Sequence, residues 1–252
     1  MKVSIITITY NSSQTIEATV KSVLNQDYQN IEYIIIDGLS KDNTLSIIEP
    51  YKKQISKIIS EKDNGLYDAL NKGISLATGD IIGMLHSDDL FAGESVISHV
   101  VQNFENHKEA RLLYADLIFI DRTDETKIRR VWKSGQYHDG HFLKGWMPPH
   151  PTFFVRREVY QQYGFFNTTL QFASDYELML RFIHKHKLKV IYLPEVIIKM
   201  RMGGASNSTI LNKIKANIED RKAWQMNGLK PSAFFMFRKP LRKVMQYFKK
   251  DF

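Results

Sequence analysis

Apolar and polar positions follow two alternating periods along the first hundred residues. Residues 3–9 (VSIITIT) form a short apolar and β-branched run, which is typical of a buried strand. Further on, Ile16, Val20, Val23 and Leu24 are spaced i, i+4, i+7 and i+8 and predict an amphipathic helix. The cycle repeats three times, and it predicts strands at 31–36, 56–60 and 80–86, and helices at 43–54, 65–77 and 94–106.

This alternation of strands and helices predicts right-handed parallel βαβ units. The first strands are apolar on both faces, as expected for a sheet that helices cover on both sides. The chain has neither G-x-G-x-x-G nor a Walker loop, which disfavours dinucleotide and P-loop sites. We therefore expect an α/β fold with a mostly parallel central sheet and flanking helices.

The regular alternation of predicted strands and helices ends after residue 110. Segment 112–132 reads as two strands around a polar turn, and the Gly-, Pro- and His-rich loop 134–151 follows without clear periodicity. The remaining pattern predicts helices at 156–163, 175–186 and 207–226, a strand at 188–193 and a tail over 229–252.

Composition and charge narrow the class of protein. Of the 252 residues, 43% are hydrophobic and 25% are charged, as in soluble globular proteins. No apolar run reaches the ~20 residues that a membrane-spanning helix needs. The N-terminus lacks a small-residue cleavage site, and the absence of cysteine excludes disulfides, thiol catalysis and thiolate metal sites. We expect a cytoplasmic protein.

The net charge of +8 is unevenly distributed. Residues 1–110 hold 9 Lys, no Arg and 15 acidic residues, whereas residues 111–252 hold 26 basic and 12 acidic residues. The asymmetry favours cation binding in the first part and binding to an anionic surface in the second, although solubility alone is the simpler alternative.

Polar side chains follow each of the four predicted parallel strands, at the edge where open α/β sheets bind ligands. They are Thr9, Tyr10 and Asn11; Asp37, Ser40, Asp42 and Thr44; Asp63, Asn64 and Asp68; and His86, Ser87, Asp88 and Asp89. Any one of them could be a turn residue or a helix cap, but a cap needs one side chain and this edge supplies many. The adjacent carboxylates of Asp88 and Asp89 suit Mg²⁺ or Mn²⁺, which bridge to substrate phosphates.

Three segments carry a resemblance to a known family. "TITYNSSQTIEATVKSVLNQDYQNIEYIIIDGLSKDNT", "SEKDNGLYDALNKGISLATGDIIGMLHSDD" and "FASDYELMLR" resemble family 2 glycosyltransferases, which are inverting enzymes of the GT-A fold. The similarity extends from residue 1 to about 205. It implies a nucleotide-sugar-binding half at 1–110, an acceptor-binding half of the same domain at 111–205, and C-terminal helices and a tail at 206–252.

The resemblance also implies roles at the strand ends. Thr9, Tyr10, Asp37 and Asp63 would line a nucleobase pocket, with Asp37 accepting from a uracil N–H. Asp88 would hold ribose or sugar hydroxyls, and Asp89 would bind a divalent metal on the diphosphate. Further donor-binding candidates at this edge are Asn11, Asp68 and Ser87. One departure is His86, where family members often have Asp or Asn; it is either a packed neutral imidazole or an extra polar contact.

The second half offers candidates for the rest of the reaction. Asp175 matches the base that would deprotonate the acceptor hydroxyl; its alternative role is a helix cap, and Glu177 is the fallback base. Trp146 could stack on a sugar and His150 could contact acceptor or phosphate, unless their loop only packs on the core. Arg201 could close over the diphosphate, or lie in a surface turn.

The C-terminal tail combines positive charge with aromatic residues. Residues 230–252 hold seven Lys or Arg against one Asp, together with five Phe and one Tyr. Such a segment can lie on an anionic bilayer, and core packing is the alternative. No nucleic-acid-binding motif accompanies it, so we expect no nucleic-acid partner.

Together with these patterns, the resemblance implies a metal-dependent inverting glycosyltransferase of the bacterial polysaccharide, O-antigen or lipopolysaccharide type. It would move a sugar from a UDP-sugar to a glycan or lipid-linked glycan, with peripheral attachment to the inner face of the cytoplasmic membrane. A nucleotidyltransferase is the rival enzyme, but "TYNSSQTIE" lacks its Gly-rich loop with Lys or Arg. A non-catalytic basic module that binds membrane or nucleic acid would leave the acidic edge unexplained.

Overall fold

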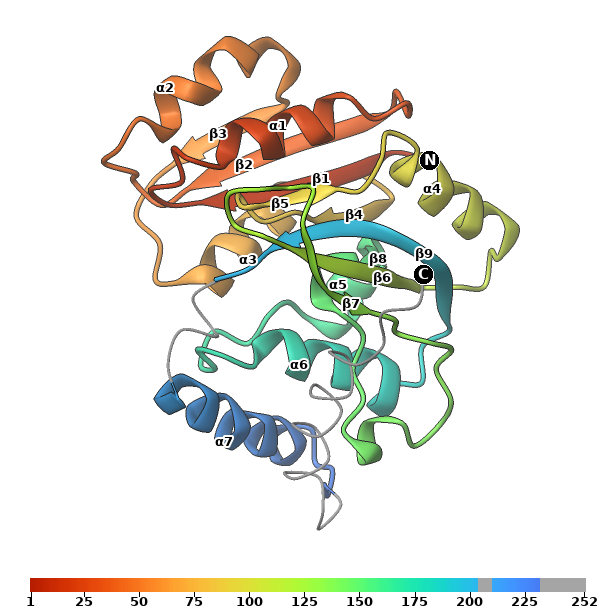
Figure 1. Ribbon diagram of the computed structural model, residues 1–252. Coiled ribbons are helices and arrows are strands. Elements are labelled where there is room, and N and C mark those ends of the chain that lie inside the picture. The colour runs from red at the N-terminus through yellow and green to blue at the C-terminus, as the bar shows by residue number, and fades with distance from the viewer. Residues whose placement is uncertain (204–209, 232–252) are drawn as a thin grey trace.

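The computed structural model describes residues 1–203 and 210–231, whose strands form one mixed sheet with helices on both faces (Figure 1). The strand order is β3-β2-β1-β4-β8-β6-β9-β5, and β7 pairs with β6. The strands are β1 (Val3–Thr9), β2 (Ile31–Asp37), β3 (Lys57–Ser60), β4 (Ile81–Met84), β5 (Asp89–Phe91), β6 (Leu112–Ile120), β7 (Ile128–Trp132), β8 (Phe154–Arg156) and β9 (Val190–Arg201). The α-helices are α1 (Ile16–Leu24), α2 (Thr44–Ile48), α3 (Leu66–Leu76), α4 (Val96–Asn106), α5 (Arg157–Tyr163), α6 (Ser174–Met179) and α7 (Ile210–Met226).

The first four strands are parallel, as their pattern predicts. β1 pairs with β2 from Val3–Ile31 to Thr9–Asp37 and with β4 on its other side, so all three end at the same edge of the sheet. β3 adds a further parallel strand beside β2. This half confirms the predicted βαβ units, and it places the four polar strand ends next to one another.

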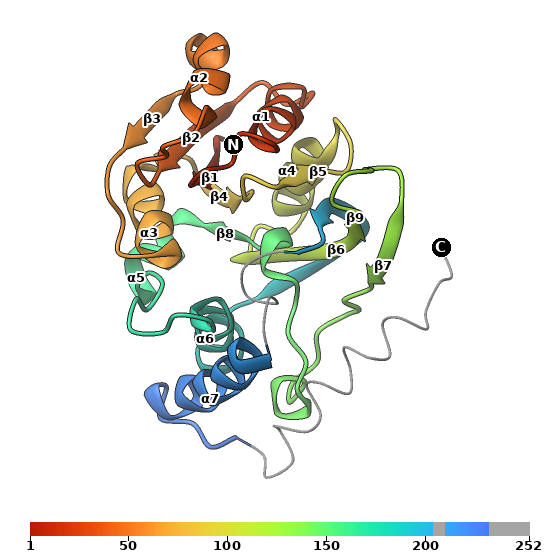
Figure 2. The ribbon, with the colours of Figure 1, turned by 60° about the vertical axis from the view of Figure 1, so that its left-hand side comes forward.

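Successive residues of a strand point to opposite faces of the sheet, and each face is covered by its own hydrophobic core. Every position of β1 is therefore buried. Ile5 packs in a core with α1 and α4, whereas Ile6 packs in the other core with α3, α5 and α6. Figure 2 shows these two groups of helices on opposite sides of the sheet. Helix α3 lies so close to β1 that a Cβ on Gly73 would come within 2.4 Å of Ile6 Cγ2.

The structure departs from the predicted pattern in three places. β8 and β5 are strands of three residues each that the sequence pattern did not reveal, and β8 pairs antiparallel with both β4 and β6. β9 is much longer than the predicted strand at 188–193, since it runs parallel to β6 as far as Arg201 and also pairs with β5 near its end. The predicted helix at 175–186 is α6 followed by a π-helical segment, Leu180–Lys185.

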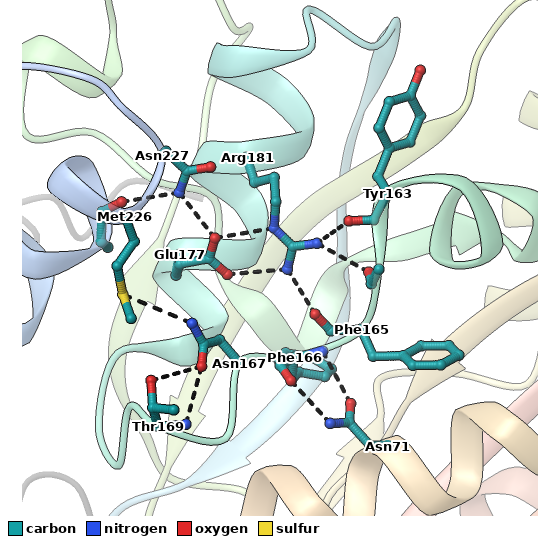
Figure 3. Close-up of polar contacts among 12 residues, drawn as sticks. Asn71, Tyr163, Phe165, Phe166, Asn167, Thr169, Glu177, Arg181, Met226 and Asn227 are labelled. Atoms are coloured by element: carbon teal, nitrogen blue, oxygen red, sulfur yellow. Dashed lines mark hydrogen bonds and ion pairs between the residues drawn. The ribbon is translucent and has the colours of Figure 1, made fainter.

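A polar network joins α6 to α7 and to the segment after α5 (Figure 3). Glu177 accepts two hydrogen bonds from Arg181, each 3.0 Å long, and one of 2.9 Å from the Asn227 side chain. The Arg181 guanidinium also donates to the main-chain oxygens of Tyr163, Gly164 and Phe165. These bonds fix α6, whose first turn faces the cavity described below. No helix within 1–203 or 210–231 is both long and apolar enough to cross a membrane.

Candidate functional site

A cavity of about 1030 Å³ opens at the carboxyl ends of β1 and β4, between the start of α3, the first turn of α6 and the end of β9. Most of the predicted site residues line it. They are Thr9, Tyr10, Asn11, Asp63, Ser87, Asp88, Asp89, His150, Asp175 and Arg201. The lining does not include Asp37, Asp68 or Trp146.

Asp89 forms the floor of this cavity. Its side chain is 1% exposed, and neither carboxylate oxygen has a hydrogen-bond partner within the described residues. The main chain of Asp89 is firmly held, because its N–H donates to the His86 carbonyl (2.9 Å) and its carbonyl accepts from Thr19 Oγ1 (2.8 Å). Burial, with the neighbouring Asp88 charge, raises the pKa of Asp89 well above its usual value. A buried carboxylate of this kind is costly unless a ligand compensates it.

Asp88 is half-buried beside it, and two arginines carry the opposite charge. Burial raises the pKa of Asp88, while the charges of Arg201 and Arg122 lower it by a smaller amount. Arg201 is the buried last residue of β9; it donates to the Asp88 carbonyl (2.8 Å) and pairs with Glu125. Arg201 is thus part of the cavity wall and not of a surface turn.

Arg122 is a site residue that the sequence reasoning missed. It lies in the turn between β6 and β7 and lines the cavity together with Arg201. In the sequence it is one of several charged residues in a polar turn, and nothing local distinguishes it. The long-range contact between this turn and the end of β9 brings it to the site, through the Glu125 pair to Arg201.

The loops after β1 and β2 hold each other in place. Asn11 has a left-handed backbone (φ 50°); its N–H donates to Ser40 Oγ, and its side-chain oxygen accepts from the Lys41 N–H, each at 2.8 Å. Asp37 is fully buried and accepts from the Ser40 hydroxyl and N–H and from Ser60 Oγ. These partners favour the turn role for Asp37 over direct contact with a nucleobase. Tyr10, in contrast, is 59% exposed at the cavity mouth.

Lys72 organises the acidic residues that precede and begin α3. Its ammonium group lies 2.7 Å from Asp63 and 2.9 Å from Glu61, and these hydrogen bonds raise the pKa of Lys72. Asp68 accepts from the Asn64 N–H (2.9 Å), which closes the turn before the helix. Of these carboxylates Asp63 reaches the cavity and Asp68 does not.

Asp175 faces the cavity from the first turn of α6, with its side chain 18% exposed. Oδ1 accepts from the Tyr67 hydroxyl (3.3 Å) and the Tyr176 N–H (2.8 Å), and Oδ2 lies 3.1 Å from His150 Nδ1. Burial, with the Asp175 charge, raises the pKa of Tyr67, so the phenol stays protonated. The fallback base Glu177 is instead buried in the network with Arg181 and Asn227 and does not line the cavity.

The aromatic loop before β8 divides into a core part and a cavity part. Trp146 is 6% exposed, donates its indole N–H to the Ser134 carbonyl (2.9 Å) and packs edge-on against Tyr114. This placement favours the packed-loop alternative and does not present Trp146 to a sugar. His150 lines the cavity and packs its ring against His86, at 5.4 Å between centroids. Burial, with the charge of His150, lowers the pKa of His86 to about 3, which matches the packed neutral imidazole.

The sequence profile of the family described as "Glycosyl transferase family 2" matches residues 4–164, well over half of the chain. The chain belongs to glycosyl transferase family 2. Its fold is of the GT-A type, and the predictions of family and fold class are both confirmed.

Relatives of this glycosyltransferase include an uncharacterized glycosyltransferase of Mycobacterium tuberculosis, 33% identical over 181 residues, which cover 71% of this chain and 68% of the relative. A second uncharacterized glycosyltransferase, from Haemophilus influenzae, is 30% identical over 223 residues, or 83% of this chain and 68% of the relative. A PGL/p-HBAD biosynthesis glycosyltransferase of Mycobacterium bovis is 27% identical over 83% of this chain and 80% of its own length.

Solved structures share the fold at low sequence identity. TarS of S. aureus in complex with UDP-GlcNAc superposes with a TM-score of 0.69 and 16% identity over 90% of this chain. The chain spans 65% of that TarS structure, slightly less than two thirds. The mannosyltransferase PcManGT of Pyrobaculum calidifontis, in complex with GDP-Man and Mn²⁺, gives a TM-score of 0.68 with 18% identity over 99% of this chain and 70% of its own.

Proposed function

We propose that this glycosyltransferase transfers a sugar from a nucleotide-diphosphate sugar, with inversion, to a hydroxyl of a glycan or lipid-linked glycan acceptor. One observation carries the proposal: the buried carboxylate of Asp89, which has no hydrogen-bond partner among the described residues, lines an open cavity together with Asp88, Arg122 and Arg201. This arrangement suits a diphosphate that is bridged to Asp89 by a cation and neutralised further by Arg122 and Arg201.

The donor set at the cavity floor fits a hard divalent cation. Mg²⁺ and Mn²⁺ take carboxylate oxygens and commonly complete their coordination with water and substrate phosphates. The described residues contain no cluster of three or more His, Asp or Glu that could enclose a metal alone, so Asp89 would hold the cation together with the diphosphate. When bound, the cation would stabilise the negative charge that develops on the leaving diphosphate.

The residues of the cavity can support each part of an inverting displacement. The acceptor oxygen forms its bond to the anomeric carbon on one face while the bond to the diphosphate breaks on the other, and the bonding electrons leave with the diphosphate. Asp175 takes the proton of the acceptor hydroxyl, a role that contributes typically ~10²–10⁴-fold. Arg122 and Arg201 provide fixed positive charge for the leaving group.

UDP is our proposed donor nucleotide. Two structural neighbours support a nucleotide-sugar donor by their bound ligands: TarS holds UDP-GlcNAc, and PcManGT holds GDP-Man with Mn²⁺. A glycan or lipid-linked glycan is our proposed acceptor, and it rests on the resemblance of the sequence to family 2 glycosyltransferases. The basic aromatic tail over 232–252 lies outside the described residues, and its binding to an anionic membrane stays a prediction.

A two-stage experiment tests the proposal. Thermal unfolding with UDP, GDP and CDP, each with and without Mn²⁺, should show stabilisation by one diphosphate that requires the metal. Nucleotide release should then be measured with UDP-GlcNAc, UDP-glucose, UDP-galactose and GDP-mannose. A chain that is stabilised by none of the nucleotides and releases nucleotide from none of the donors would contradict the proposal.

A further inference from the structure

His150 is held in one place by the chain around it. It is the first residue of a short 3₁₀ segment, His150–Thr152. The prolines directly before and after His150, Pro149 and Pro151, restrict the backbone at this point. Thr152 is fully buried; its hydroxyl lies 2.9 Å from the Pro149 carbonyl and 3.0 Å from the Ala115 carbonyl, donates its one proton to either of them, and accepts from the Ala115 N–H (3.1 Å). The loop is therefore anchored to β6, which fixes the backbone of His150 beside the cavity.

Two side chains contact the His150 ring. His86 packs against it with 64° between the ring planes, and this neighbour is a neutral imidazole. Nδ1 of His150 lies 3.1 Å from Asp175 Oδ2. A carboxylate oxygen can only accept, so Nδ1 carries the proton and donates it.

Asp175 is thereby held from three directions. The Tyr67 hydroxyl and the Tyr176 N–H donate to Oδ1, and His150 donates to Oδ2. The donors come from α3, from α6 itself and from the loop before β8, so the orientation of the carboxylate depends on three separate parts of the fold. A carboxylate so held is preorganised for reaction, and misplacement by ~1 Å can cost ~10²-fold in rate.

We propose that His150 is a positioning residue, which acts through its hydrogen bond to Asp175 and not through contact with donor or acceptor. This inference rests on the proposed role of Asp175 as the base. His150 orients the carboxylate, and the proton of the acceptor hydroxyl still goes to Asp175.

Two isosteric substitutions test this role. The amide nitrogen of asparagine takes about the position of histidine Nδ1, whereas that of glutamine takes about the position of Nε2. His150→Asn should keep kcat within about threefold of the native value, while His150→Gln should lower kcat by ~10–100-fold. The KM for the nucleotide sugar should stay within about twofold in both, because neither change reaches the donor. The substrate is whichever of the four tested nucleotide sugars releases nucleotide fastest, with Mn²⁺ present.

A double-mutant cycle separates positioning from direct contact. If His150 acts only through Asp175, then His150→Gln should change the residual kcat of Asp175→Asn by less than about twofold. An equal loss in both backgrounds would overturn the proposal and would indicate direct contact with the substrate. Equal kcat for His150→Asn and His150→Gln would overturn it as well.

Folding and the proposed function are checked independently. Each variant should unfold within a few degrees of the native protein and keep its UDP-dependent stabilisation. If His150→Gln does not fold, His150→Ala, which also removes the donor to Oδ2, replaces it in the cycle with Asp175→Asn. Failure of the native chain with every donor would contradict the proposed function, whereas an active native chain with an additive cycle contradicts only the role of His150.

Discussion

Glu32 and Asp89 are buried carboxylates at opposite ends of the parallel sheet, and they differ in how many hydrogen bonds they accept. At the amino end Glu32 accepts from Ser4 Oγ (2.5 Å), from the Thr78 N–H and hydroxyl (both 2.7 Å) and from Lys2 Nζ (3.1 Å). At the carboxyl end both oxygens of Asp89 are buried without a hydrogen-bond partner in the described part of the chain.

This difference in hydrogen bonding suits Glu32 to a structural role and Asp89 to the binding of a ligand. Burial alone would raise the pKa of Glu32, but its hydrogen bonds outweigh that and lower the pKa to about 2. Burial and the Asp88 charge raise the pKa of Asp89, and the main chain and charge of Arg201 offset this only in part. A carboxylate satisfied by its own chain stabilises the fold, whereas one left without donors destabilises it until a ligand binds.

The largest expected effect comes from Asp89→Asn, which removes the charge at the cavity floor. Transfer should fall by at least ~10³-fold, because both the cation and the diphosphate lose their anchor. Nucleotide release from the best donor, measured with and without EDTA, checks this. Activity near the native level, or native activity that excess EDTA leaves unchanged, would contradict the metal role.

The same variant should be at least as stable as the native chain. The folded-state pKa of Asp89 is above its unfolded value of about 3.9, so its contribution to stability falls as pH rises above that value. Without metal, Asp89→Asn should therefore match the native protein near pH 4 and exceed it in free energy of unfolding at pH 7.5. Urea unfolding in EDTA at the two pH values measures the difference.

Asp175 and Glu177 give a second contrast within one turn of α6, because Asp175 lines the cavity and Glu177 does not. Asp175→Asn should lower transfer by at least ~10²-fold and leave UDP affinity unchanged, because the base lies on the acceptor side. The matched control is Glu177→Gln, which should cost about 1–3 kcal/mol of stability through its buried bonds to Arg181 and Asn227. Its kcat per folded molecule should stay close to native. A crippled kcat in the control and not in Asp175→Asn would move the base to Glu177.

Arg122 offers a smaller test on the donor side. Arg122→Gln should raise the donor KM by about tenfold, the loss of one charge-assisted contact. Arg129, on the same hairpin, pairs with Asp121 and does not line the cavity, so Arg129→Gln serves as the control. Similar KM values for the two variants would remove Arg122 from the site.

Glu32→Gln should have the smallest effect on transfer, since Glu32 lies at the far end of the sheet. The pKa of about 2, against an unfolded value of about 4.3, corresponds to about 3 kcal/mol of stability that is present above pH 5 and lost as pH falls toward 2. The variant should lack this acid-dependent loss while kcat stays native. Thermal unfolding between pH 3 and pH 7 checks it.

Periodicity was sufficient for the parallel half of the fold. Runs such as β1 and β2 are apolar on both faces, and this pattern distinguishes covered parallel strands. The sequence did not predict β5 and β8, because a strand of three residues is too short to show a hydrophobic period. They form by pairing with β9, β4 and β6, which lie far away in the sequence.

The site was predictable where strand ends gathered carboxylates, and less so elsewhere. Asp88 and Asp89 line the cavity, as their positions after a strand suggested, whereas Asp175 was a candidate only through the family resemblance and also lines the cavity. The sequence did not predict Arg122 as a site residue, because only the tertiary contact of the β6–β7 turn with the end of β9 brings it to the cavity. Trp146 could not be separated from a sugar-stacking residue, because the burial of an aromatic side chain depends on neighbours far along the chain.

Glu219 of α7 accepts the main-chain N–H groups of Gln171, Phe172 and Ala173, the three residues just before α6. These amides belong to no helix or strand, so their hydrogen exchange would be fast if α7 were detached. Their protection therefore reports the docking of α7 directly, at the residues next to the turn that carries Asp175. A chain that ends before Glu219 would lose this protection first, while amides in β1 and β2 would still exchange slowly.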